Sequence, residues 1–305
     1  MEFRIKRGVF ETQRTQCLVL GVVEGKLKEP LLQVLDQQAG GALTRSFRSK
    51  EFTGADGEKL LVHAGQGVPW ERLLLVGMGK ERDLSLARLR KASSAAAYFL
   101  LERKIGSFLA ALTQVPIKNS RLEERIQAFG EGILLADYRF TSYLGEKQQK
   151  RITVLSTVSV WLAPGEKRNE AEAALAVASQ ICCGVQFARD LVNQPGNEKS
   201  PEYMADQALQ MAKEVGIKAT LLKRKELEKE GFGGVLGVAQ GSVRDPFLIV
   251  LEYCGGTEDA HPIALVGKGV VFDSGGISLK PSEKMDEMKM DMAGAAAVLG
   301  AMSAA

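Results

Sequence analysis

The sequence predicts an α/β protein built in two parts, and three observations support that prediction. Short apolar runs typical of buried strands alternate with helical patterns through the first part of the chain. Ala163-Pro164-Gly165 then interrupts the alternation, and a long helical pattern follows over 170–192. A turn-forming stretch at 193–197 precedes a second series of strands and helices. We therefore expect an N-terminal α/β domain over 1–165, a connector helix over 166–192 and a second α/β domain over 193–305.

In the first part each element has its own signal. The run Cys-Leu-Val-Leu-Gly-Val-Val over 17–23 has the continuous apolar character of a strand that is buried on both faces. Between 85 and 103, apolar residues recur at three- and four-residue steps, which is the spacing of one helix face. The same criteria predict strands over 17–23, 59–64, 72–76, 108–112 and 152–162, and helices over 30–39, 85–103 and 122–135. The glycines and lysine of 76–80 lack the full spacing of a phosphate-binding loop and indicate a tight turn.

The second part opens with a helix start signal. Ser200 is a suitable N-cap residue, and Pro201 suits the first helical position, so a helix is predicted up to Val215. The charged stretch that follows is typical of a solvated helix face, and the glycine-rich stretch after it is typical of a loop. The predicted elements are strands over 219–222, 247–253 and 263–266, a charged helix over 223–230 and a loop over 231–241.

The amino-acid composition indicates which partners, which cellular compartment and which kind of metal ligands to expect. The 305 residues carry 40 basic against 37 acidic side chains and 6% aromatics, which does not favour nucleic acid or a membrane surface as the main partner. No apolar run reaches the roughly 18 residues of a membrane span, and the N-terminus has no secretory signal. Four cysteines without a CxxC motif indicate reduced thiols in the cytoplasm. Two histidines do not suffice for a His-rich zinc site, so a metal would need mainly oxygen ligands.

The segment 266–291 has the most unusual chemistry. Lys268 follows the predicted strand 263–266 between two glycines, and Asp273 ends a second apolar stretch before Ser-Gly-Gly. Side chains at such strand ends face a crevice in α/β domains. Two interpretations stay open from the residues alone. The segment forms either a buried Lys–Asp ion pair with a glycine turn, or a metal or anion site. Its methionines are either core filler or part of a substrate pocket.

The stretch VGKGVVFDSGGISLKPSEKMDEMKMDMAGAAA, residues 266–297, closely resembles the signature region of the leucyl (cytosol) aminopeptidases. These are two-metal exopeptidases that remove N-terminal residues from peptides. The stretch Ala-Arg-Asp-Leu-Val-Asn at 188–193 is similar to the entry of their catalytic domain. The resemblance implies a macro-domain-like α/β domain over 1–165, a connector helix, and the first part of an α/β/α catalytic domain.

The resemblance also implies roles for individual residues. Lys268 would ligate one metal through its amine, Asp273 would bridge both metals, and Asp291 would share the metal of Lys268. Lys280 would be the catalytic residue that holds the polarised carbonyl oxygen, and Met288 would line the pocket for the N-terminal side chain. Lys268 and Asp273 would also be among the substrate-binding residues. The expected cofactors are two divalent metal ions, which are manganese, zinc or magnesium.

One departure from the family pattern concerns a second metal-binding signature, Asn-Thr-Asp-Ala-Glu-Gly-Arg, which does not occur in these 305 residues. We therefore expect an N-terminal portion of such an enzyme, truncated before that signature and inactive or nearly so by itself. A smaller departure is Ala293, where the family usually has glycine. The chain is expected to act on peptide substrates in the cytoplasm, as part of a homo-oligomer that is a hexamer in the family. The alternative is a non-catalytic module for oligomerisation or for binding a ligand or DNA.

Overall fold

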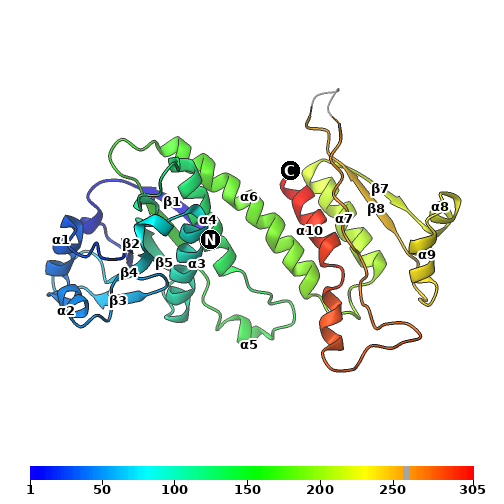
Figure 1. Cartoon of the computed structure of the whole chain (residues 1–305), viewed down its shortest axis with the longest axis horizontal. Helices are drawn as coiled ribbons and strands as arrows, with labels where there is room; N and C mark the ends of the chain where they lie inside the picture. The colour runs from blue at the N-terminus through cyan, green and yellow to red at the C-terminus, as the bar shows by residue number, and fades with distance from the viewer. Residues whose placement is uncertain (257–260) are drawn as a thin grey trace. The chain divides into compact units, whose positions relative to one another are not determined.

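The computed structural model describes residues 1–256 and 261–305, and the chain forms two compact units, Met1–Ser179 and Gln180–Ala305. The helix expected over 170–192 is confirmed as α6 (Arg168–Asn193), and the boundary between the units falls inside it (Figure 1). The first turns of α6 therefore belong to the first unit and its last turns to the second.

The first unit is built on a six-stranded sheet with the order β1-β6-β5-β2-β4-β3. All neighbouring strands are parallel except β3 and β4, which are antiparallel. The strands are β1 (Glu2–Lys6), β2 (Leu18–Val23), β3 (Lys59–His63), β4 (Arg72–Gly79), β5 (Ser107–Ala110) and β6 (Thr157–Trp161). The five predicted strands are confirmed. The edge strand β1 was not predicted, and its alternating charged and apolar residues suit a strand that is exposed on one face.

Helices cover both faces of this sheet, which confirms the predicted α/β class (Figure 1). Neighbouring residues of one strand point to opposite faces, so Val19 and Leu74 lie in one core and Leu18 and Leu73 in the other. The first core includes α3 (Leu86–Glu102), α4 (Leu122–Asp137) and the start of α6, and the second includes α1 (Pro30–Gln38) and α2 (Ala42–Arg48). The unit also contains α5 (Glu146–Gln149) and the 3₁₀ turns η1 (Phe10–Thr12), η2 (Glu81–Asp83) and η3 (Leu112–Gln114).

The turn predicted over 76–80 is wrong, because β4 continues to Gly79. A Cβ atom at Gly77 would lie 1.9 Å from the carbonyl oxygen of Ala55, so the neighbouring chain leaves no room for a side chain there. Gly77 therefore allows a close approach of two backbones within the sheet region.

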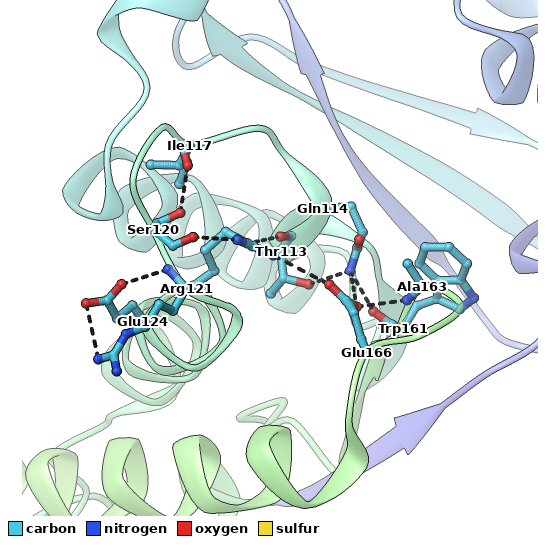
Figure 2. A network of polar contacts seen from close by, with 10 residues as sticks. Thr113, Gln114, Ile117, Ser120, Arg121, Glu124, Trp161, Ala163 and Glu166 are labelled. Carbon is cyan, nitrogen blue, oxygen red and sulfur yellow. Dashed lines mark hydrogen bonds and ion pairs between the residues drawn. The ribbon is translucent and has the colours of Figure 1, made fainter.

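A polar network fixes the link between β6 and α6 (Figure 2). The Glu166 carboxylate accepts hydrogen bonds from the Ala163 amide at 2.8 Å and from Gln114 Nε2 at 2.9 Å. Arg125 approaches the other carboxylate oxygen at 3.5 Å, and the side chains of this ion pair are only 18% and 17% exposed. The loop that begins α6 is thus held to η3 and α4 by a mostly buried carboxylate.

The second unit packs α7 (Pro201–Val215) and α10 (Ala293–Ala304) into one apolar core with the last turns of α6. Ser200 caps α7 by accepting a hydrogen bond from the Tyr203 amide at 3.1 Å, as the sequence predicts. The remaining elements are the antiparallel pair β7 (Lys218–Leu222) and β8 (Leu248–Glu252), helices α8 (Arg224–Lys229) and α9 (Gly233–Ala239), and the 3₁₀ helix η4 (Met285–Met290).

Two expectations for this unit are wrong. The glycine-rich stretch 231–241 contains the short helix α9. The predicted strand 263–266 is irregular, and Ile263 and Val266 are 89% and 94% exposed. An apolar run forms a strand only where a neighbouring strand satisfies its N–H and C=O groups, and β8 pairs with β7 alone among the described residues.

By length and composition, α6 is the one helix of the described residues that could cross a membrane. Core helices of soluble proteins share this length and composition. Ala171 and Ala174 of α6 lie in the core of the first unit, and Leu191 lies in the core of the second. Val177, Ile181 and Val185, between these two groups of contacts, are exposed.

Candidate functional site

Lys268 lies against the first turn of α10 through its backbone. Its carbonyl oxygen accepts a hydrogen bond from the Ala295 amide at 2.8 Å. A Cβ atom at Gly267 would lie 2.3 Å from the carbonyl oxygen of Gly294, so only glycine allows this approach. The glycine before Lys268 therefore sets the position of the lysine relative to α10.

The same approach brings Lys268 to Asp291, the residue that ends η4. The Lys268 Nζ atom lies 2.9 Å from Asp291 Oδ2, and the two side chains are 60% and 21% exposed. Oδ2 itself is buried and has no aligned hydrogen bond from any part of the chain that the structure describes. The ammonium of Lys268 is thus the charged group nearest to this buried oxygen.

Asp273 and Lys280 form a second ion pair across a tight loop. Lys280 Nζ lies 3.1 Å from Asp273 Oδ2, and the Gly275 amide donates to Asp273 Oδ1 at 2.9 Å. Gly275 has a φ of +91°, and Gly275 and Leu279 form an isolated antiparallel bridge that returns the chain to Lys280. The Gly275 amide and, next, the Lys280 ammonium lower the pKa of Asp273, and the charge of Lys268 lowers it further.

The structure thus brings the four charged candidates into two ion pairs, and the charge of Lys268 acts on the carboxylates of both. Of the two interpretations that the residues left open, the ion pair is present, but it is partly exposed rather than buried. The expected placement of Lys268 at a strand end is wrong, because 263–266 is irregular. Met288 lies in η4 and is half-buried.

Sequence reasoning missed Lys199, which is completely buried. Its ammonium donates to the carbonyl oxygens of Leu191 at 3.0 Å, Val192 at 3.2 Å and Lys289 at 2.6 Å. Burial, with a smaller contribution from the charge of Lys289, lowers the pKa of Lys199 to about 8. Nothing in the local sequence marks this lysine, because lysines are almost always exposed and its partners lie up to 90 positions away.

The donor set fits a divalent cation. A buried carboxylate oxygen of Asp291 lacks an aligned hydrogen bond and lies beside a lysine amine, and the Asp273 carboxylate is close enough to sense the same amine. Nitrogen and carboxylate oxygen donors suit zinc or manganese. Nowhere in residues 1–256 or 261–305 do three or more His, Cys, Asp or Glu side chains form a group that could hold a metal ion.

Comparisons with known proteins match two separate segments of the chain to models of one family. A family model described as the cytosol aminopeptidase family, N-terminal domain, matches residues 19–147. The model of the catalytic domain of the same family matches residues 186–305. The second match includes all of the candidate site residues.

Curated relatives match along the whole chain. A probable cytosol aminopeptidase of Syntrophotalea carbinolica is 49% identical over 294 residues, which cover 96% of this chain and 59% of the relative. One from Dechloromonas aromatica is 41% identical over 310 residues, which cover 100% of this chain and 61% of the relative. The chain therefore spans about three fifths of the length of these relatives.

Solved structures of similar fold include a tomato leucine aminopeptidase variant, with a TM-score of 0.84 and 25% identity, covering 100% of this chain and 59% of that one. The bottromycin maturation enzyme BotP in complex with Mn matches with a TM-score of 0.73 and 27% identity, over 95% of this chain and 56% of that one. On the two family models together with these relatives, the chain belongs to the cytosol aminopeptidase family.

Proposed function

We propose that this chain is part of a metal-dependent aminopeptidase that releases N-terminal residues, preferably leucine-like ones, from peptides. The observation that supports the proposal best is the buried Asp291 Oδ2 atom, which lies 2.9 Å from the amine of Lys268. Family membership and the names of the relatives support the peptidase activity.

In this proposal Lys268, Asp273 and Asp291 hold the metal ions. Bound divalent ions would supply Lewis acidity and an activated water. Lys268 must give up its proton to serve as a ligand, because an ammonium group has no free lone pair. Metal and proton therefore compete for the same nitrogen, and metal affinity rises with pH. The Gly275 amide and the Lys280 ammonium lower the pKa of Asp273 below its ordinary value, so its carboxylate would bind metal without first losing a proton.

Lys280 and Met288 would act on the peptide. Lys280 forms an ion pair with Asp273 at 3.1 Å, and its side chain is 37% exposed, so its ammonium would reach the carbonyl oxygen of the scissile bond from the solvent side. Such a charge stabilises the oxyanion that develops there. Met288 is half-buried in η4, and a flexible apolar side chain of this kind suits contact with an apolar N-terminal residue.

Manganese, zinc or magnesium would serve as the metal, and manganese is supported by the Mn in the BotP complex. We place the protein in the cytoplasm, as the names of its relatives suggest, and expect a homo-oligomer, a hexamer as in the family. The 305-residue polypeptide supplies two carboxylates and one amine, so by itself it is expected to show little or no turnover.

Calorimetric titration of the 305-residue polypeptide with MnCl₂ or ZnCl₂ tests the proposed metal site. Wild type is expected to bind, and Lys268→Met and Asp291→Asn are each expected to weaken binding at least tenfold, because each removes one ligand. Lys229→Met, at an exposed lysine of α8, is the matched control and should bind like wild type. Equal binding by all four proteins, or none by wild type, would refute the metal site. Release of leucine from Leu-p-nitroanilide, measured in parallel, tests the expectation of low turnover.

A further inference from the structure

The C-terminal end of α6 is capped by lysine side chains. The last four carbonyl groups of a helix have no partner within the helix. At the end of α6 the Asp190 carbonyl accepts from the Gln194 amide at 3.2 Å. The Leu191 and Val192 carbonyls accept from the ammonium of Lys199, and the Asn193 carbonyl accepts from the ammonium of Lys289 at 3.4 Å. The ammonium groups of two lysines outside α6 thus supply hydrogen-bond donors to the last carbonyl groups of this helix.

The third hydrogen bond of the Lys199 ammonium goes elsewhere, to the Lys289 carbonyl oxygen in η4 at 2.6 Å. An ammonium group has three N–H donors, and this one uses all three on backbone carbonyls. The partial negative charge at the end of α6 favours a cation in this position. Lys199 therefore joins α6 to η4, and Lys289 joins the same two elements in the reverse direction through its side chain.

Lys289 is two positions before Asp291, and the Asp291 amide donates to the Met288 carbonyl at 3.2 Å. The backbone that carries Met288 and Asp291 is thus attached to α6 at a point between these residues. Burial makes the attachment rigid, since Lys199 is inaccessible to water and has no alternative acceptor in solvent.

We propose that Lys199 is a positioning residue of the candidate metal site, whose ammonium fixes η4 against the end of α6 and thereby holds Asp291 beside Lys268. The inference rests on the proposed function for the role of Asp291, while the attachment of η4 is testable without metal. According to this proposal, Lys199 contributes to the metal affinity although it is not itself a metal ligand. Its effect on the ligand passes entirely through the backbone of residues 289–291.

The test combines Lys199→Met with two measurements on the 305-residue polypeptide. Hydrogen–deuterium exchange followed by mass spectrometry, without metal, should show exchange over 285–291 at least tenfold faster than in wild type. Calorimetric titration with MnCl₂ should show at least tenfold weaker binding at a temperature where circular dichroism reports a folded protein. Lys199→Gln retains two N–H donors and should recover part of both losses. Lys229→Met is the control for the loss of a lysine and should leave both readouts unchanged.

The outcomes separate this inference from the proposed function. Absence of Mn²⁺ binding by wild type refutes the metal site, and the metal-free exchange data then decide whether Lys199 holds η4. If wild type binds Mn²⁺ and Lys199→Met binds equally well, the positioning role is refuted. If Lys199→Met does not fold, Lys199→Gln replaces it, and a Mn²⁺ affinity and an exchange rate equal to those of wild type refute the role.

Discussion

Replacement of Gly267 by alanine should displace Lys268 from α10. The added Cβ would lie 2.3 Å from the Gly294 carbonyl oxygen and 2.6 Å from the Ala295 nitrogen, and neither backbone atom can rotate away. Relief of this overlap requires a shift that breaks the 2.8 Å hydrogen bond from the Ala295 amide to the Lys268 carbonyl. Overpacking costs about 1–3 kcal/mol and the lost hydrogen bond about 1 kcal/mol, so local stability should fall by about 2–4 kcal/mol.

Hydrogen exchange at the first turn of α10 measures this loss directly. A change of about 2–4 kcal/mol corresponds to amide exchange that is roughly 30-fold to several hundredfold faster. Exchange of the Ala295 amide should show the largest increase, because its acceptor moves away. The strands of the first unit should exchange as in wild type, since the atoms nearest to the added Cβ all belong to Gly294 and Ala295.

Gly269→Ala provides the matched control two positions further along the chain. A Cβ at Gly269 would lie 3.5 Å from the Ala295 side chain, which is an ordinary van der Waals distance, so exchange in α10 should change less than fivefold. Equal exchange in Gly267→Ala and Gly269→Ala would refute the argument that the backbone approach holds Lys268 in place.

Two further predictions concern the polar interior of each unit. Glu166→Ala removes the acceptor of the Ala163 amide and of Gln114 Nε2, so the first unit should lose about 1.5–3 kcal/mol, measured by urea unfolding with tryptophan fluorescence. Lys199 has a pKa lowered from 10.5 to about 8, so between these pH values the unfolded chain binds more protons than the folded one. The free energy of unfolding of the second unit should therefore rise with pH across that window, by at most about 1.4 kcal/mol per pH unit, and Lys199→Met should abolish the rise.

Each of these two predictions can be contradicted by its own measurement. An unchanged urea midpoint for Glu166→Ala would mean that the network contributes nothing to the first unit, and Glu172→Ala, at an exposed position of α6, is the comparison. Hydrogen exchange in α10 between pH 7 and pH 10.5, corrected for the intrinsic rate, reports the second unit. A stability that rises with pH equally in wild type and Lys199→Met, or that does not rise in wild type, would show that Lys199 does not cause the pH dependence.

Much of the first unit could be predicted because its signals are local. Residues 17–23 are apolar on both sides of the strand, and the structure buries them in two cores on opposite faces. Ser85 and Ser200 begin α3 and α7 as N-caps, through hydrogen bonds to amides three positions ahead. The irregular segment 263–266 was mispredicted for the converse reason. Its apolar run is a local signal, while a strand also needs a partner that the run does not specify.

The sequence by itself determined the alternation of strands and helices and the order of Lys268, Asp273, Lys280 and Asp291 along the chain. Only the tertiary structure decided which lysine pairs with which carboxylate, and that Lys199 is buried against η4. The physical reason is sequence separation. Side-chain periodicity and capping act within a few residues and leave a pattern in the sequence. The Lys199–Lys289 contact joins residues 90 positions apart, through backbone carbonyls that carry no residue-specific signal.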